Sequence, residues 1–281
     1  MTTNTTPDVN ALRAICVELR ADIIEMLCLA GSGHPGGSLS AVEILVALFW
    51  GPLRHDPKNP GWPDRDRVVL SKGHGCPALY AVLARHGYFP REELWRLRKT
   101  GAMLQGHPVR SFTPGIEANT GALGQGLSVA QGMALAARLD GSARRTHCIC
   151  GDGELQEGSV WEAAMSAGKY RLDNLTAIID FNKGQIDGHV AEVMPLDPLD
   201  KKFAAFGWHV ITVDGHDLAA LATAYAEAAA TKGKPTVIIA DTVKGKGVSF
   251  MEGLIKWHGV TPTREEADRA IAEIRAAGAA A

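Results

Sequence analysis

Between residues 146 and 240 the sequence alternates between short apolar segments and longer segments with helical spacing. The apolar runs predict strands at 146–150, 175–180, 209–213 and 236–240. In the segments between them, apolar residues recur every three to four positions, which predicts helices. Such alternation is typical of a parallel sheet with helices on both faces. We therefore predict an α/β fold built around one parallel sheet.

The first third of the chain fits the same architecture. Apolar residues recur at helical spacing over 10–30, and Gly31 is expected to end that helix. The segment GSGHPGGS is expected to form a loop, and Ser40 to cap a second helix. RVVLS at 67–71 predicts a short buried strand, and KGHG directly after it is expected to open another helix.

The sequence predicts one long irregular segment, a C-terminal helix and a single domain. Residues 99–120 show little periodicity, and a loop of that length in a compact domain usually carries function. Residues 263–277 predict an amphipathic helix that begins with a Thr-x-x-Glu capping box. We expect a single domain over residues 10–281, preceded by a disordered N-terminus at residues 1–9.

Charge and composition exclude several classes of partner. The net charge is −2, with acidic and basic residues interspersed, so we expect neither nucleic acid nor a membrane surface as a partner. No apolar run approaches the roughly 20 residues of a membrane span, and the N-terminus lacks the pattern of a signal peptide. The five scattered cysteines suggest no zinc site and fit a reducing compartment. We expect a cytoplasmic protein that binds small molecules.

A carboxylate lies between two glycines at the start of a predicted helix, in Gly151-Asp152-Gly153. Helix N-termini attract phosphate, which an acid there would repel unless a cation lay between them. The next predicted strand ends just before Asn182, and parallel strands bring their carboxyl ends to one edge of the sheet. Asp152, Asn182 and a loop carbonyl would suit Mg²⁺ or Ca²⁺ with phosphate. An Asp helix cap followed by an ordinary turn Asn is the alternative.

Histidines in glycine-flanked loops are candidates for ligand contact. His34, His74 and His107 each follow a glycine, where a side chain has few packing neighbours. Imidazole can hydrogen-bond a polyol and transfer protons near physiological pH. A surface or helix-capping histidine is the alternative for each residue taken singly.

Seven segments, in order, resemble the N-terminal, diphosphate-binding half of a transketolase, from about Asp8 to beyond His258. They are SGHPGGSLS at 32–40, LSKGHG at 70–75, GHP at 106–108, TGALGQGLS at 120–128, GDGELQEGSVWE at 151–162, DFNKGQIDG at 180–188 and WHG at 257–259. The Gly-Asp-Gly and the later Asn also resemble the thiamine diphosphate signature, although Phe181 stands where the family commonly has a first Asn. The resemblance implies the thiamine diphosphate-binding fold.

The resemblance also implies roles for individual residues. Asp152, Asn182 and the backbone carbonyl of Gly184 would bind Mg²⁺, for which Ca²⁺ or Mn²⁺ could substitute. The implied cofactor-binding residues are His74, Gly121, Leu123, Gly151, Asp152, Gly153, Glu157, Asn182, Ile186 and His258. The implied catalytic histidines are His34, His74, His107 and His258. Glu157 and Glu162 match acids at the interface between active sites, although an acid in the first helical turn is also explained by the helix dipole.

A complete transketolase also contains a pyrimidine-binding domain, whose glutamate activates the cofactor, and this chain ends before any such domain. The resemblance thus implies one subunit of a split transketolase, which transfers a two-carbon ketol unit from a ketose phosphate to an aldose acceptor. Its expected partner is a polypeptide with the pyrimidine-binding and C-terminal domains, in an α2β2 heterotetramer. Pentose phosphate cycling and a catabolic route that uses another pentulose phosphate both stay open.

Other functions fit the sequence less well. An NAD-dependent dehydrogenase is disfavoured because the glycines at 121–126 follow the order GxxGxG rather than GxGxxG. A non-catalytic relative is disfavoured because Asp152, Asn182 and the four histidines are all present. SGHPGG and LSKGHG favour a transketolase over deoxyxylulose-phosphate synthase and over the α-chain of a 2-oxoacid dehydrogenase.

Overall fold

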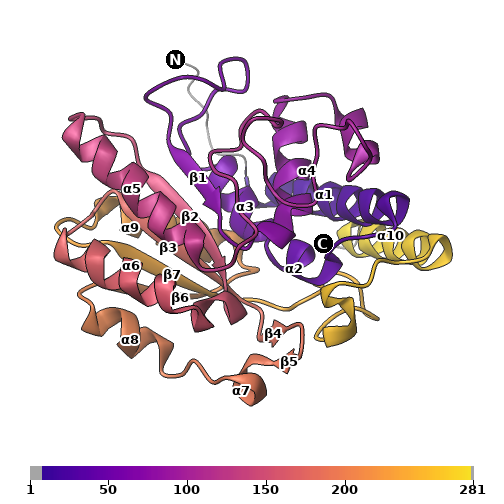
Figure 1. Ribbon diagram of the computed structural model, residues 1–281. Helices are drawn as coiled ribbons and strands as arrows, with labels where there is room; N and C mark the ends of the chain where they lie inside the picture. The colour runs from indigo at the N-terminus through magenta and orange to yellow at the C-terminus, as the bar shows by residue number, and fades with distance from the viewer. Residues whose placement is uncertain (1–7, 280–281) are drawn as a thin grey trace.

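A five-stranded parallel sheet forms the centre of the fold (Figure 1). The computed structural model describes residues 8–279. The strands lie in the order β1 (Arg67–Leu70), β2 (Thr146–Gly151), β3 (Leu175–Phe181), β7 (Thr236–Asp241) and β6 (His209–Asp214), and every neighbouring pair is parallel. A separate two-stranded hairpin consists of β4 (Gly184–Gln185) and β5 (Gly188–His189). The predicted parallel sheet is confirmed.

Helices account for most of the remaining regular structure. The α-helices are α1 (Val9–Ala30), α2 (Pro35–Ser40), α3 (Val42–Phe49), α4 (Cys76–His86), α5 (Gln125–Leu139), α6 (Gly158–Lys169), α7 (Val190–Val193), α8 (Leu199–Ala205), α9 (Leu218–Ala230) and α10 (Arg264–Ala279). The 3₁₀ helices are η1 (Gly73–Gly75), η2 (Arg91–Arg96), η3 (Gly153–Gln156) and η4 (Ile255–His258). As expected, residues 99–120 contain no helix or strand.

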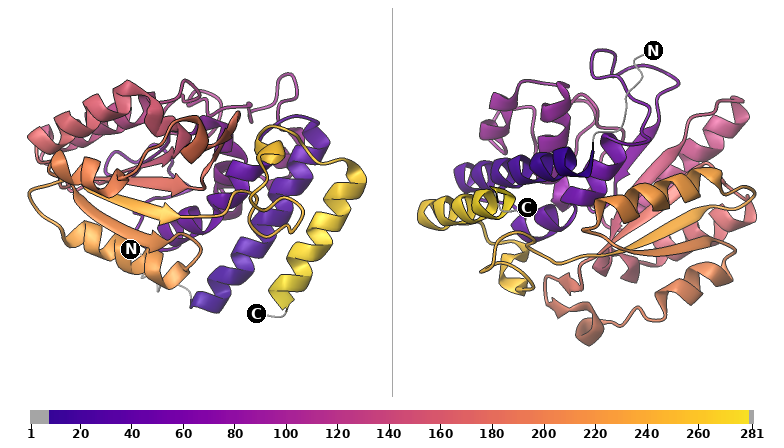
Figure 2. Two further views of the ribbon diagram at one scale, coloured as in Figure 1. Left: turned by 90° about the horizontal axis from the view of Figure 1, so that it is seen from below. Right: turned by 180° about the vertical axis from the view of Figure 1, so that it is seen from behind.

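Alternate residues of the central strands face two separate hydrophobic cores. Ile178 and Ile238 pack in the core beneath α1, α3, α4, α9 and α10, whereas Ile179 and Ile239 pack in the core beneath α5, α6 and α8. Successive side chains of a strand point to opposite faces, so two apolar faces require helices on both sides. Figure 2 shows α1 and α10 lying side by side at the edge of the first layer. The prediction of a single domain with helices on both faces is confirmed.

The loop predicted for GSGHPGGS is confirmed at residues 31–34 but wrong from Pro35 onward, and the cap predicted for Ser40 is wrong. Residues Pro35–Ser40 form α2, which has a proline at its start. The N-cap of α3 is Ala41, which makes no capping hydrogen bond from its side chain. Ser40 Oγ instead donates to Asp180 Oδ2 at 2.6 Å. A contact with a distant strand thus replaces the local cap, and local sequence rules do not describe such contacts.

The structure tests the predicted N-terminal boundary of the domain and the capping box predicted for the last helix. The Asp8 side chain caps α1, and Val9 is the first helical residue, so the end of the predicted disordered segment 1–9 is helical. The rest of that segment, residues 1–7, lies outside the described residues. The predicted capping box is present, because the Glu266 backbone N–H donates to Thr263 Oγ1 at 3.2 Å. Among residues 8–279, none of the helices has the length and hydropathy to cross a bilayer.

A buried ion pair joins α1 to α3. Arg20 Nη1 lies 2.7 Å from Glu43 Oε1, and the two side chains are only 8% and 9% exposed. Glu43 Oε2 also lies 2.9 Å from His216 Nδ1. Burial alone would raise the pKa of Glu43, but the charge of Arg20 and the hydrogen bonds from His216 and Arg20 lower it to about 2. Glu43 therefore stays ionised inside the core.

We predict that Glu43 makes the protein sensitive to acid. Because its folded pKa of about 2 lies below its ordinary 4.5, its contribution is fully present above pH 4.5 and is lost as the pH falls toward 2. The shift corresponds to about 3 kcal/mol. Urea unfolding of the wild type and of Glu43→Gln from pH 7 to pH 2 measures it. The wild type should lose more of its unfolding free energy over this range, and equal losses would contradict the prediction.

Candidate active site

A cavity of about 310 Å³ lies at the carboxyl ends of the parallel strands. Lys72 follows β1, Asp152 follows β2, Asn182 follows β3 and Lys244 follows β7, and all four line the cavity. Ligands of open α/β sheets bind at this edge. The cavity lining includes these residues predicted from the sequence: His34, His74, Gly121, Leu123, Gly151, Asp152, Gly153, Glu157, Asn182, Gly184, Ile186 and His258.

Two predicted residues lie apart from this lining. The His107 ring centre lies 6.5 Å from that of His34, so it borders the same region. Glu162 is exposed on α6 and is absent from the cavity wall. The structure thus brings the predicted cofactor and metal residues together, and it leaves Glu162 on the outer surface.

Asp152 is a buried carboxylate held by backbone N–H groups. Its Oδ1 accepts a hydrogen bond from Gly153 N at 2.7 Å, and its Oδ2 accepts one from Lys183 N. Burial and, to a lesser degree, the nearby Asp180 charge together raise the pKa of Asp152 to about 6, against the opposing backbone hydrogen bonds and the charge of Lys244. The ionised form of Asp152 is therefore short of positive charge, which a bound cation would supply.

Asn182 and Gly184 place two further oxygens near this carboxylate. Asn182 Nδ2 donates to Ser40 Oγ at 3.3 Å and to Asp180 Oδ2 at 3.2 Å, while its Oδ1 accepts from Gly184 N at 3.2 Å. The Gly184 carbonyl accepts from Lys244 Nζ at 3.0 Å. Carboxylate, amide and carbonyl oxygens are the donor set that Mg²⁺ and Ca²⁺ prefer. Over residues 8–279 no group of three or more His, Cys, Asp or Glu side chains forms a metal site, so phosphate or water oxygens would have to complete this one.

Two buried lysines face the cavity, and the sequence analysis missed both. Lys72 is 1% exposed and Lys244 is 2% exposed. Lys72 Nζ donates to the Gly37 carbonyl at 2.7 Å and pairs with Asp180. Burial and the charge of Lys72 lower the pKa of Lys244 to about 8. Each lysine follows closely after a parallel strand, which is the one signal in the sequence that points to them, but their burial beside the cavity is visible only in the fold.

Glu154 ties three segments of the cavity wall together. Its Oε1 accepts from Gly124 N at 2.9 Å and from Ser71 Oγ, and its Oε2 accepts from Gly151 N at 3.0 Å. Burial raises the pKa of Glu154, and these three hydrogen bonds oppose that rise. The loop before α5, the end of β1 and the Gly-Asp-Gly turn are thereby fixed relative to one another.

Three of the four candidate histidines form a cluster at the mouth of the cavity. The ring centre of His34 lies 5.2 Å from that of His74 and 5.6 Å from that of His258, and the last two rings are 5.2 Å apart. Burial lowers the pKa of His34 to about 4, with a contribution from Arg98, and lowers that of His258 to about 3, with one from Lys244. The pKa values of His74 and His107 are lowered too, again mainly by burial.

These pKa shifts define what the histidines can do. At neutral pH the rings are uncharged, so they act as hydrogen-bonding groups rather than as cations. Within the described part of the chain, the buried Nδ1 atoms of His34 and His258 have no hydrogen-bond partner. Buried polar atoms are usually paired, so two unpaired ring nitrogens beside a cavity indicate that a polar ligand binds there.

We predict that the close approach of two cavity loops requires glycine at position 73. A Cβ atom there would lie 2.8 Å from the backbone of Thr120 and Gly121. Gly73→Ala should lower the free energy of unfolding by about 1–3 kcal/mol, as overpacking does. Gly132→Ala is the control, because its Cβ would meet nothing within 4 Å on the exposed side of α5. Urea unfolding would contradict the prediction if Gly73→Ala were no less stable than the control.

Comparison with known proteins identifies the class that this fold and cavity represent. The family model for the transketolase thiamine diphosphate binding domain matches residues 8–276. The chain is 36% identical to transketolase from Campylobacter jejuni in a solved structure, with a TM-score of 0.91 over 96% of this chain and 43% of that one. The chain therefore spans less than half the length of that full transketolase.

Two similar proteins are transketolase subunits of about the same length as this chain. The 6-deoxy-6-sulfo-D-fructose transketolase subunit of Clostridium sp. (strain MSTE9) is 49% identical over 94% of this chain and 98% of its own length. An apulose-4-phosphate transketolase subunit of Phocaeicola vulgatus is 44% identical over 91% of this chain and 90% of its own. The chain belongs to the transketolase thiamine diphosphate binding domain family and is a homologue of transketolase subunits. The resemblance inferred from the seven sequence segments is thus confirmed.

Proposed function

We propose that the cavity binds thiamine diphosphate together with Mg²⁺. Asp152, Asn182 and the Gly184 carbonyl would hold the metal ion, and Lys244, with Lys72 behind it, would face the diphosphate. The observation that carries the proposal is that a buried carboxylate, Asp152, and two buried lysines, Lys72 and Lys244, line one cavity at the strand ends. A cation beside Asp152 and an anion beside Lys244 would each offset a cost of burial.

The remaining cavity residues would position the cofactor and the sugar. Gly151 and Gly153 would allow the diphosphate to approach the backbone, and Gly121, Leu123 and Ile186 would contact the cofactor rings. When bound, thiamine diphosphate supplies the chemistry of two-carbon transfer. The four neutral histidines would hydrogen-bond the hydroxyl groups of the ketose donor and hold protons close to the reacting atoms. His74 and His258, which line the same cavity, would also contact the cofactor.

We predict that Asp152→Ala abolishes Mg²⁺-dependent cofactor binding, because the ion loses its only charged protein ligand. Asp187→Ala is the matched control, since Asp187 lines the same cavity but is exposed. Calorimetric titration with thiamine diphosphate, with and without Mg²⁺, should show a loss of at least about 100-fold in affinity for the first variant and little change for the second. Unchanged Mg²⁺-dependent binding in Asp152→Ala would show that the metal assignment is wrong.

We propose that the active enzyme needs a second polypeptide with the pyrimidine-binding and C-terminal domains, in an α2β2 assembly. The names of the two subunit relatives support a divided enzyme. Glu157, which is exposed and lines the cavity, and Glu162, which is exposed on α6, would lie at the interface between active sites of the assembly. The five cysteines are free, which supports a reducing, cytoplasmic location.

The proposed substrate is a ketose phosphate that donates its ketol unit to an aldose. Arg98 donates to the Gly106 carbonyl and adds positive charge beside His34 and His107, where a sugar with an anionic end would lie. A non-standard sugar is the alternative, since the two subunit relatives are named for a sulfonated fructose and for apulose 4-phosphate. Both kinds of sugar carry an acidic group.

We predict ketol transfer from xylulose 5-phosphate to ribose 5-phosphate only when the chain is combined with its partner, in the presence of thiamine diphosphate and Mg²⁺. The chain alone should be inactive because the group that activates the cofactor would come from the partner. A coupled assay for glyceraldehyde 3-phosphate measures the reaction. Activity of the isolated chain would contradict the divided site, whereas a complex that binds cofactor without turnover would favour a non-standard sugar.

A further inference from the structure

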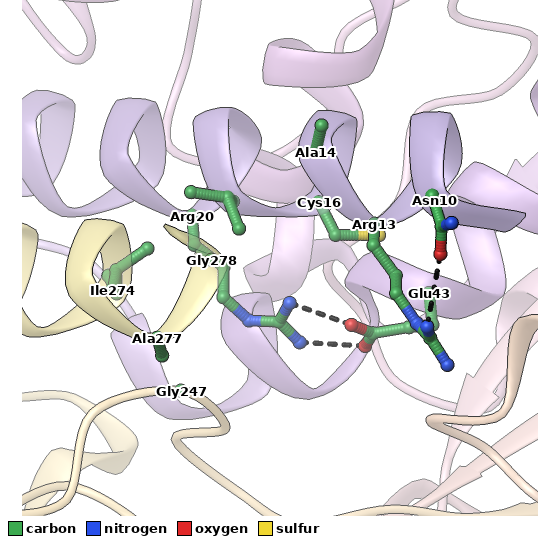
Figure 3. Close-up of a pocket in the computed structure, with 11 residues that line it drawn as sticks. Asn10, Arg13, Ala14, Cys16, Arg20, Glu43, Gly247, Ile274, Ala277 and Gly278 are labelled. Atoms are coloured by element: carbon green, nitrogen blue, oxygen red, sulfur yellow. Dashed lines mark hydrogen bonds and ion pairs between the residues drawn. The ribbon is translucent and has the colours of Figure 1, made fainter. Parts of the chain in front are cut away.

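Two side chains from separate elements hydrogen-bond to the backbone of the turn at residues 243–247, a third side chain joins them, and none of the three lines the cavity. Arg20 Nε of α1 donates to the Lys246 carbonyl at 3.0 Å. His216, between β6 and α9, accepts a hydrogen bond at Nε2 from the Val243 N–H, at 2.9 Å. Glu43 of α3 connects the two, because it contacts both Arg20 and His216. Figure 3 shows the paired contacts of Arg20 and Glu43 beside a hollow of about 490 Å³.

The hydrogen bonds of His216 determine its orientation and its tautomer. Since Nε2 accepts from a backbone N–H, the ring proton is on Nδ1, which donates to Glu43 Oε2 at 2.9 Å. The His216 side chain is only 13% exposed. Both ring nitrogens are therefore used, and neither faces the cavity that we assign to the cofactor. Arg20 in turn forms an ion pair with the Glu43 carboxylate, so the three side chains restrict one another's positions.

The same turn carries Lys244 into the cavity. Lys244 follows Val243 directly, and its Nζ donates to the Gly184 carbonyl at 3.0 Å. In α2, the Gly36 carbonyl accepts a hydrogen bond from Gly245 N at 2.9 Å, and a Cβ on Gly36 would lie 2.9 Å from Lys244 Cγ. The backbone at 243–245 is thus held by hydrogen bonds at both Val243 and Gly245. A shift at Val243 would move the ammonium group that faces the proposed diphosphate.

We propose that His216 is a positioning residue for cofactor binding: held by Glu43 and Arg20, it fixes the Val243 N–H and thereby aims Lys244 at the diphosphate. This inference rests on the proposed function of the cavity. The role of His216 is indirect, because it contacts neither the cavity nor the proposed metal ligands. Removal of groups that orient metal ligands typically costs about 10- to 100-fold in affinity, and for His216, which acts on a lysine, we expect the lower end of that range.

Two substitutions separate the two contacts of His216. In His216→Asn the amide can replace Nδ1 and still donate to Glu43, but it offers no acceptor to Val243. In His216→Gln the longer side chain can place its oxygen near the former Nε2 and accept from Val243. We expect thiamine diphosphate with Mg²⁺ to bind the full-length His216→Asn chain about tenfold more weakly, and His216→Gln to restore most of the affinity. Hydrogen exchange at the Val243 amide, without cofactor, should be faster in the Asn variant only.

A double-mutant cycle with Lys244→Met tests whether His216 acts through Lys244. If it does, His216→Asn should cause little further loss of affinity once Lys244 is gone. Losses that multiply in the double variant, or a Val243 amide that stays protected in His216→Asn, would overturn the proposal. Should His216→Asn fail to fold, Glu43→Asp, which keeps a charge for Arg20 but withdraws from His216, replaces it in the cycle.

The same measurements separate this proposal from the proposed function. A wild-type chain and complex that bind no thiamine diphosphate would refute the cofactor site and, with it, the purpose we assign to His216. Normal binding in the wild type together with unchanged binding in His216→Asn would refute only the role of His216.

Discussion

The buried ion pair between Lys72 and Asp180 holds the site together. Asp180, near the end of the central strand β3, is 0% exposed, and Lys72 is 1% exposed. Asp180 also accepts hydrogen bonds from Ser40 in α2, from Thr242 after β7 and from Asn182. Burial alone would raise the pKa of Asp180, but the charge and hydrogen bond of Lys72 outweigh it and lower that pKa. Removing one charge of such a pair typically costs about 3–5 kcal/mol, because the other stays buried without a partner.

Because Lys72 and Asp180 pair with each other, neither of them neutralises the nearby charges of Asp152 and Lys244. Asp152 has a raised pKa and Lys244 has a lowered one, so burial disfavours the charged form of each. A metal ion at Asp152 and a diphosphate at Lys244 would favour both charged forms at once. Binding of the metal ion and the diphosphate together would relieve the unfavourable burial of the Asp152 and Lys244 charges, and this relief would contribute to the free energy of binding. Glu154 ties the loops around Asp152 together, and the proposed role of His216 would hold Lys244 in place, which would reduce the reorganisation needed on binding.

Much of this architecture could be predicted because it depends on local patterns. The four strands of the parallel sheet after residue 145 begin at the predicted residues and extend one residue further, since apolar runs mark buried strands, whereas the short hairpin of β4 and β5 was not predicted. The Gly-Asp-Gly turn and Asn182 were placed together by the rule that parallel strands end at one edge. Helix α2 could not be predicted in this way, because its two glycines weaken the helical signal and its stability comes from packing.

The residues that the sequence analysis missed share one property. Lys72, Lys244 and His216 owe their importance to partners distant in the chain, such as Asp180, Gly184 and Glu43. A buried lysine has the same appearance in a sequence as an exposed one, and only the fold shows that it faces a cavity. His216 follows a glycine, as three of the candidate histidines do, yet its ring accepts a hydrogen bond from the Val243 backbone N–H and does not line the cavity.

The most direct test of the account is to locate the metal ion. Crystals of the chain, or of its complex with the partner, grown with thiamine diphosphate and Mn²⁺ in place of Mg²⁺, would reveal the ion by its anomalous scattering. The account predicts one strong peak within coordination distance of Asp152, Asn182 and the Gly184 carbonyl, with diphosphate density between the ion and Lys244. A cofactor bound without a peak at Asp152, or a peak within the histidine cluster instead, would contradict it.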